Sequence, residues 1–222
     1  MAPLLFAILV NNLLKSWHGR INFVDDTTTF EIIPRGSPSI LPLVVDEISN
    51  FASIRGMQLN PKKCKEMIVS FLKYNHTYIA PTFISGFPVE VVSTFKLLAV
   101  ILSNDLTWRA HVDHVLKKAN SRLYALRKLR RAGLNQSDLV NVYCSLVMSC
   151  LEYASPSWAS LSATLSEDIE SLQRRALRII YPDLSYMDAL FVSGLDTLAN
   201  RRHECCMKFI SKVRECKSDN NP

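Results

Sequence analysis

Two adjacent carboxylates near the start of the chain, Asp25 and Asp26, are the residues best placed to do chemistry. They follow Phe23-Val24 and precede the run Thr27-Thr28-Thr29-Phe30. β-Branched and aromatic residues favour strands and Asp does not, so the pattern predicts a hairpin over 21–32 with the acids at its tip. Carboxylates held side by side on a rigid turn can ligate Mg²⁺, which usually takes one or two protein carboxylates. A bare Asp-Asp pair is more often a solvated turn, because Asp forms turns by bonding to the local backbone.

The segments around these acids predict a mixed α+β arrangement that extends to about residue 104. Apolar residues at helical spacing between Ile40 and Ile54 predict a helix that Gly56 ends, and we expect Phe23 to pack against it. An apolar run near the N-terminus predicts another helix, over 4–16. Short runs rich in β-branched and aromatic residues predict strands over 67–71, 77–84, 88–92 and 95–102.

Beyond Asn104 the strand pattern stops and helices are expected. Thr107 is a candidate N-cap for a long helix that ends near Arg131 and carries one apolar stripe. Further helices are expected over 136–154, 163–181, 185–192 and 196–215. The sequence therefore predicts three parts: an α+β part over 1–104, an all-α helical region over 105–216 and a polar tail over 217–222.

Four short motifs occur in order along the α+β part. They are Pro3-Leu4-Leu5-Phe6, Phe23-Val24-Asp25-Asp26, the segment from Gly56 to Lys65 that contains Asn60 and Lys63, and Phe95-Lys96-Leu97-Leu98-Ala99-Val100. With segments 151–158 and 173–178 of the helical region, they resemble the reverse transcriptases of non-LTR (LINE-type) retrotransposons over nearly the whole chain. The resemblance implies that residues 1–104 are the second half of a truncated polymerase palm, with β-hairpins and packed helices. It implies that residues 105–216 are a thumb-like region.

The resemblance also implies a reaction, that of an RNA-directed DNA polymerase. This nucleotidyltransferase adds deoxynucleotides to a primer under the direction of a template, with two metal ions. Asp25 and Asp26 are then catalytic residues that ligate Mg²⁺, and Lys63 is the catalytic lysine near the incoming triphosphate. The implied partners are an RNA template, a DNA primer and deoxynucleoside triphosphates. The implied primer-gripping hairpin consists of Leu98, Ala99 and Val100.

Departures from the family's pattern bear on activity. Ala2, Asn12, Val24 and Ala99 stand where the family usually has Gly, Asp, Ala and Gly. The family's first catalytic Asp lies upstream of the element at which this chain begins, and two metal ions need carboxylates from two strands. No feature favours the nearest alternatives, which are Glu31, Asp46 and Glu47. We therefore expect the fragment to be inactive alone and its Mg²⁺ binding to be weak or absent. The alternative is a non-catalytic nucleic-acid-binding or protein-interaction domain derived from a retrotransposon.

Basic residues gather in clusters along the helical region. The formal net charge of +6 favours an anionic partner, nucleic acid above all. Each cluster is also what a solvated helix face or a helix C-terminus favours without any ligand. Trp108, Tyr143, Tyr153 and Trp158 could stack on bases, although aromatic residues at helical spacing more often form the core. The candidate nucleic-acid-binding residues are Arg127, Lys128, Arg130, Arg131, Arg174, Arg175 and Arg178, with Arg201 and Arg202 as a third cluster.

Cysteine usage and the N-terminus bear on the compartment. The six cysteines form no Cys-x-x-Cys pair, which favours a reduced intracellular protein over a disulfide framework. The sequence His203-Glu204-Cys205-Cys206 is a poor zinc site, because a helix aims those side chains in different directions. The apolar N-terminal run lacks a preceding positive charge and is too short to span a bilayer. We therefore expect neither a signal peptide nor membrane insertion, and a location in the nucleus or cytoplasm.

Overall fold

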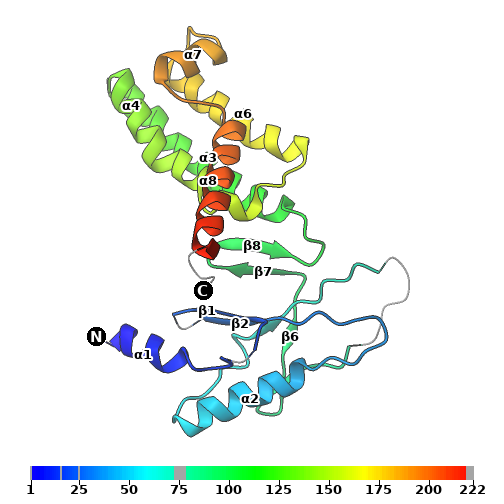
Figure 1. The fold of residues 1–222 in the computed structure, drawn as a ribbon. Helices are drawn as coiled ribbons and strands as arrows, with labels where there is room; N and C mark the ends of the chain where they lie inside the picture. Colours follow the sequence, from blue (N-terminus) through cyan, green and yellow to red (C-terminus); the bar gives the residue numbers. More distant parts are fainter. Residues whose placement is uncertain (1, 16, 25, 73–78, 219–222) are drawn as a thin grey trace. The chain divides into compact units, whose positions relative to one another are not determined.

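The structure is a computed structural model that describes residues 2–15, 17–24, 26–72 and 79–218 (Figure 1). Over these residues it combines helices with four sheets of two strands each, a mixed arrangement compatible with the α+β class. The chain divides into two compact units, Met1–Phe95 and Lys96–Pro222. The division lies within strand β7 (Thr94–Leu97), upstream of the boundary expected at Asn104–Asp105.

The N-terminal unit begins with helix α1 (Ala2–Val10) and a hairpin of strands β1 (Arg20–Phe23) and β2 (Asp26–Thr29). The strands pair antiparallel, with Phe23 opposite Asp26, so the predicted hairpin is confirmed. Gly19 lets the chain enter it. A Cβ at this position would lie 2.0 Å from the carbonyl oxygen of Phe30, whose N–H donates to the Gly19 carbonyl at 2.8 Å.

The hairpin directs polar side chains toward the end of α1. Arg20 Nη1 donates to the carbonyls of Asn11, at 2.9 Å, and Leu13, in the segment that follows the helix. Asn22 Nδ2 donates to the carbonyl of Val10 at 3.4 Å. Phe23 is 57 % exposed. Successive strand residues point to opposite faces, and Asn22 lies on the face of β1 that is turned toward the protein, so Phe23 lies on the solvent face. The prediction that Phe23 packs against the helix over 40–54 is therefore wrong.

Helix α2 (Leu41–Ile54) begins where a distant carboxylate caps it. Glu31 accepts hydrogen bonds from the backbone N–H groups of Ile40, at 3.0 Å, and Leu41, at 3.3 Å. These first-turn donors have no partner within the helix, and a negative charge is favoured there. The helix ends just before Gly56, whose φ of +67° suits a residue without a side chain, as the sequence predicted.

Two small apolar clusters hold this unit together, and α2 contributes to both. Val44 packs with the buried residues that follow α1, whereas Val45 packs with Ile84 and Val89. Around the second cluster, β3 (Lys65–Glu66) pairs parallel with β6 (Glu90–Val91). Strands β4 (Phe83–Ile84) and β5 (Phe87–Pro88) form an antiparallel hairpin around Gly86.

Other strand predictions for this unit are not met. Residues 67–71 form no strand and Phe71 is 83 % exposed, because a β-branched run becomes a strand only where another strand pairs with it. The first residues of the strand expected over 77–84 lie outside the described part of the chain. Each sheet of the described residues has only two strands, and no polymerase palm is shown.

A third hairpin, of β7 and β8 (Val100–Ser103), leads into the C-terminal unit. Leu98 and Ala99 form its turn with φ of +45° and +67°, the left-handed values that two-residue hairpin turns use. The single strand predicted over 95–102 is therefore two strands. Asp105 then accepts hydrogen bonds from Ser103 Oγ, at 2.6 Å, and from the Thr107 N–H, at 3.0 Å.

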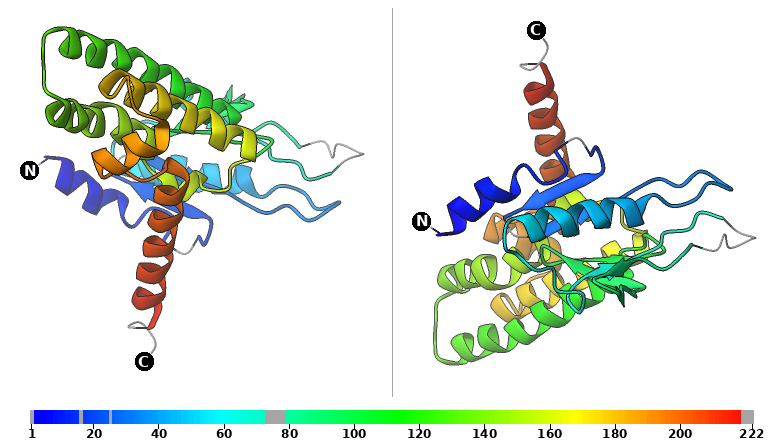
Figure 2. Two further views of the ribbon diagram at one scale, coloured as in Figure 1. Left: turned by 90° about the horizontal axis from the view of Figure 1, so that it is seen from above. Right: turned by 90° about the horizontal axis from the view of Figure 1, so that it is seen from below.

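Helix α3 (Arg109–Arg131) follows this turn, with Trp108 as its N-cap residue. Thr107 is not the N-cap that the sequence predicted, because its hydroxyl bonds to the Asp105 carboxylate. Helices α3, α4 and α6 lie side by side in the unit (Figures 1 and 2). The remaining helical segments are α4 (Gln136–Val142), the π-helix η1 (Tyr143–Met148), α5 (Ser149–Glu152), the 3₁₀ helix η2 (Ser155–Trp158), α6 (Ala163–Ile180), α7 (Tyr186–Ser193) and α8 (Leu198–Ser218). The helices predicted here are confirmed to within a few residues.

One apolar core unites these helices. Leu123 and Leu126 of α3, Leu172 and Ala176 of α6 and Trp158 of η2 are all fully or almost fully buried. The Trp158 indole N–H donates to the Tyr153 carbonyl at 2.9 Å, so the ring is buried without losing its polar partner.

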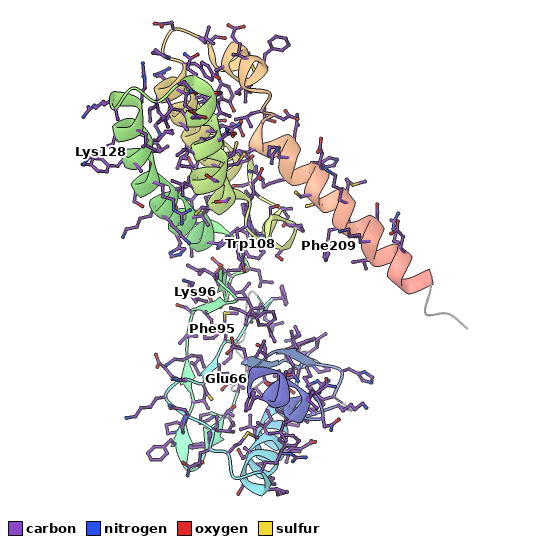
Figure 3. The ribbon with its side chains drawn as sticks, turned by 90° about the vertical axis from the view of Figure 1, so that its left-hand side faces the viewer. Glu66, Phe95, Lys96, Trp108, Lys128 and Phe209 are labelled. Atoms are coloured by element: carbon purple, nitrogen blue, oxygen red, sulfur yellow. The ribbon has the colours of Figure 1, made fainter. Side chains whose placement is uncertain are left out.

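Helix α8 extends beyond the helices on which it packs (Figure 2). Its first residue, Leu198, is buried, whereas Phe209, labelled in Figure 3, is 56 % exposed on the outer half. Among the described residues no helix is both long enough and apolar enough to cross a membrane.

Replacing Leu123 by Ala is expected to lower the free energy of unfolding by about 2–5 kcal/mol, because the side chain is fully buried and its loss leaves a cavity. The matched control is Leu146→Ala. That side chain is 41 % exposed, so its loss should cost less than about 1 kcal/mol. Urea denaturation followed by circular dichroism measures both. Equal losses would contradict the assignment of Leu123 to the core.

His111 is a buried titratable group in the same core. Its Nδ1 accepts a hydrogen bond from the Ile101 N–H at 3.2 Å, and its ring lies edge-on to Trp158, with ring centroids 5.2 Å apart. Its Nε2 has no hydrogen-bond partner among the described residues. Burial, and secondarily the nearby His114, lower the pKa of His111 below its ordinary value of 6.5, so the neutral ring is favoured in the fold.

This lowered pKa predicts a pH-dependent stability. Below pH 6.5 the unfolded chain protonates His111 while the folded chain resists protonation, so the free energy of unfolding falls as the pH decreases. The slope from this group is at most about 1.4 kcal/mol per pH unit and vanishes above the unfolded pKa. Urea titrations between pH 5 and 7 should show a shallower slope for His111→Asn, which keeps an acceptor and does not titrate. The exposed control His203→Gln should keep the wild-type slope, and identical slopes in all three proteins would exclude this role for His111.

Candidate nucleic-acid interface

Five arginines from two helices line one hollow in the C-terminal unit. Arg127, Arg130 and Arg131 come from the last turns of α3, and Arg175 and Arg178 from the C-terminal half of α6. The hollow has a volume of about 550 Å³, and Ile179 adds an apolar wall. We call this hollow, with its six lining residues, the arginine cleft.

The packing of α3 on α6 explains why these arginines meet. Arg127 follows the buried Leu126, and Arg175 precedes the buried Ala176. Because neighbouring helix residues are separated by 100°, a residue next to the buried seam flanks it and reaches solvent. The two helices share one core, so the arginines that flank the seam on each side face a common hollow.

The charges of the arginine cleft have one sign. All five guanidinium groups belong to exposed residues, and no acidic side chain lines the hollow. Within the described part of the chain, the ion pairs that form do not involve any of these five. The helix dipole favours arginines at the C-terminal ends of α3 and α6 one at a time. The helix dipole does not explain why five positive charges share one hollow that no carboxylate lines. A bound polyanion would balance these charges.

Two other predicted binding residues lie outside the arginine cleft. The Lys128 ammonium lies over the ring of Tyr124, 5.0 Å from its centroid, on the outer side of α3 (Figure 3). Arg174 forms an ion pair with Glu167, and its guanidinium lies 5.5 Å from the ring centroid of Tyr186. Neither side chain lines the hollow. Residues adjacent in the sequence point to different sides of a helix, so each basic cluster contributes only some of its members to the cleft.

The third basic cluster has a structural environment. Arg201 forms an ion pair with Glu152, with a second contact from Nη2 to Oε2 at 2.9 Å. Arg202 is almost fully buried and donates from Nη2 to Ser166 Oγ at 2.6 Å. Burial lowers the pKa of Arg202, and the nearby Glu170 opposes that shift by attraction. These two arginines therefore connect α8 to α5 and α6, and neither lines the arginine cleft.

The residues expected to form a metal site are not brought together in the described structure. Asp25 lies outside the described residues. Asp26 is exposed at the start of β2, and Lys63 is exposed in the turn after Asn60, whose carbonyl accepts the Lys63 N–H at 3.0 Å. Glu31, an alternative carboxylate, is occupied at the start of α2. No three His, Cys, Asp or Glu residues among those described form a group that could hold a metal ion.

The aromatic residues divide into core and surface. Trp158 and Tyr143 are fully buried, Trp108 is half-buried, and the exposed Tyr153 donates its hydroxyl to the Leu98 carbonyl at 3.1 Å. The sequence reasoning missed Tyr124, which is 59 % exposed. Its position three residues before Arg127 and seven before Arg131 was the available signal, because that spacing puts all three on one helix face.

Fold and cleft together define the C-terminal unit as a helical unit with a basic surface cleft. The family model described as "Alkylated DNA repair protein alkB homolog 8, N-terminal" matches residues 108–149. The matched segment covers α3 and α4 and includes Arg127, Arg130 and Arg131, and it is well short of half the chain. No curated protein and no solved structure matches the chain.

These comparisons correct the identification drawn from the motifs. The family match is to a different family and nothing points to a reverse transcriptase, so the expected LINE-type resemblance is contradicted. The polymerase activity and the retrotransposon origin are contradicted with it. The catalytic roles of Asp25, Asp26 and Lys63 and the primer-gripping role of Leu98, Ala99 and Val100 depended on that resemblance.

Local structure explains why the motifs misled. Phe23 ends β1 and Asp26 begins β2, and Leu98-Ala99 is the turn between β7 and β8. Asn60 Oδ1 accepts the Lys62 N–H at 3.1 Å, so Asn60 serves its own turn. Each of these three motifs therefore meets a local backbone requirement that many unrelated proteins share.

Arg175→Gln is expected to leave the free energy of unfolding unchanged or to raise it by up to about 0.5 kcal/mol at low salt. Arg175 lies among like charges and forms no ion pair within the described residues, so its removal relieves repulsion. Added salt should erase any gain through screening. Urea denaturation at low and high salt measures this. A loss above about 1 kcal/mol would give Arg175 a structural role instead.

Proposed function

We propose that the C-terminal unit binds nucleic acid through backbone phosphates held in the arginine cleft. The observation that carries the proposal is the convergence of five exposed arginines, from two helices, on a hollow that no acidic side chain lines. Guanidinium groups present planar, paired donors that match phosphate oxygens, and arginine keeps its charge at all physiological pH values.

Two further observations support this choice of ligand. The whole chain carries a formal net charge of +6, which favours encounter with a polyanion. The family model that matches residues 108–149 bears the name of a protein of alkylated DNA repair, and the matched segment supplies three of the five arginines. Phosphates contacted in this way give affinity and orientation, and they carry no base sequence information.

The test is the salt dependence of binding by the full chain. Labelled RNA and DNA strands of roughly 12 nucleotides are titrated by fluorescence anisotropy across roughly 50–200 mM salt. We expect the logarithm of the binding constant to fall linearly with the logarithm of the salt concentration. The combined variant Arg127→Gln, Arg130→Gln, Arg131→Gln should reduce the slope by roughly 2–3, because each arginine that contacts a phosphate contributes about 0.7–0.9.

A matched control separates the arginine cleft from overall charge. The control variant Lys117→Gln, Lys118→Gln, Arg174→Gln also removes three positive charges from α3 and α6, but it leaves the residues that line the cleft unchanged. It should keep a slope close to that of the wild type. Equal effects of the two variants would assign the binding to net charge, and a wild-type slope near zero would exclude phosphate binding altogether.

A further inference from the structure

Tyr124 is a large exposed aromatic residue beside the arginine cleft. Arg127 and Arg131 of the cleft follow Tyr124 by three and seven residues, about one and two helical turns. All three side chains therefore share one face of α3. The axial separation from Tyr124 to Arg131 is about 10 Å at 1.5 Å per residue. One nucleic-acid strand can therefore reach both the ring and the guanidinium groups.

The Tyr124 side chain is not part of the apolar core. It is 59 % exposed, in contrast to Tyr143 and Tyr181, which belong to the core. Its hydroxyl has no hydrogen bond among the described residues, whereas those of Tyr143, Tyr153 and Tyr186 each have at least one. Single exposed aromatic residues are common, so the informative point is that Tyr124 shares a face of α3 with two arginines of the cleft, Arg127 and Arg131.

The neighbouring lysine occupies one side of the Tyr124 ring. The Lys128 ammonium lies over one face at 5.0 Å from the centroid, a cation–π contact that favours one orientation of the ring. A flat partner then stacks on the opposite face, with positive charge close by on Lys128 and Arg127 for its phosphate. Every base has a π-face, so such a platform tolerates any sequence.

From this arrangement we infer that the arginine cleft takes single-stranded nucleic acid, with an unpaired base stacked on Tyr124. The inference rests on the proposed function and adds the class of strand. In a duplex the bases are stacked on one another within the helix, so their faces cannot reach a ring on a convex helix surface, although the phosphates still reach the arginines. A basic groove combined with an aromatic platform is the arrangement that selects single strands.

The test uses the full chain with three probes of equal length: a single strand, the same strand in a duplex, and a strand with abasic sites. Tyr124→Leu should weaken binding to the intact single strand by roughly fivefold to 100-fold, the range expected for one lost base stack. Its salt slope should not change, because stacking releases no counterions. Binding of the duplex and of the abasic strand should be unaffected.

Two control variants complete the experiment. Tyr124→Phe keeps the ring and should retain wild-type affinity. Phe209→Leu removes an aromatic residue of similar exposure, 56 % against 59 %, from α8, which Figure 3 shows away from Lys128, and should have no effect. Tyr124→Leu lies on an exposed helix face and is not expected to unfold the chain, which circular dichroism verifies.

The outcomes are distinguishable. Equal losses for the intact strand, the duplex and the abasic strand, or no loss at all, would overturn the stacking role while salt-dependent binding upholds the proposed function. Absence of salt-dependent binding by the wild-type chain would overturn the proposed function, and the stacking role with it.

Discussion

The packing of α3 against α6 is the constraint on which the candidate interface depends. Each helix buries an apolar seam, with Leu123 and Leu126 on one side and Leu172 and Ala176 on the other. Protein cores are close-packed, so the rotation of each helix about its own axis is fixed by these contacts to within a fraction of a turn. Rotation in turn decides which arginines reach the arginine cleft. The electrostatics of the surface are therefore a consequence of apolar packing beneath it.

A buried polar network fixes the register of the same helices. Gln173 on α6 accepts from the Tyr143 hydroxyl at 2.6 Å and donates to Tyr186 at 3.1 Å and to the Asp196 carbonyl at 3.0 Å. Glu170, one turn earlier, accepts from Tyr186 and from the Leu198 N–H at the start of α8. Burial raises the pKa of the Tyr143 hydroxyl, so it remains a hydrogen-bond donor at neutral pH. Since an unpaired buried polar group costs about 1–3 kcal/mol, a shift of α7 or α8 along α6 would be penalised.

The division of basic residues into a cleft and a set of structural contacts has a simple electrostatic logic. Arg174, Arg201 and Lys128 each have a carboxylate or an aromatic ring as partner, and the buried Arg202 bonds to Ser166. The five arginines of the cleft have no such partners within the described residues, so their charge remains available to solution. The sequence presents all nine as similar clusters. The distinction depends on which acids and rings the fold brings near each of them.

The local features of this chain could be predicted from its sequence. β-Branched and aromatic residues around the acids predicted the β1–β2 hairpin, and apolar spacing predicted the helices from α3 to α8, because these patterns act through neighbours a few residues away. Three predictions failed for separate reasons. The outer face of β1 exposes Phe23, the Asp105 carboxylate binds the Thr107 hydroxyl, and residues 67–71 lack a strand partner. The function inferred from short motifs also failed, since a turn sequence reports the needs of a turn and function resides in assembled sites. From the sequence alone, the seven candidate binding residues of α3 and α6 had equal standing, with Lys128 and Arg174 among them. Tertiary structure selected the five arginines that share one hollow, because helix rotation and long-range packing are properties of the whole core. The contact of Lys128 with Tyr124, and the face that Tyr124 shares with Arg127 and Arg131, follow from helical spacing and were in the sequence already.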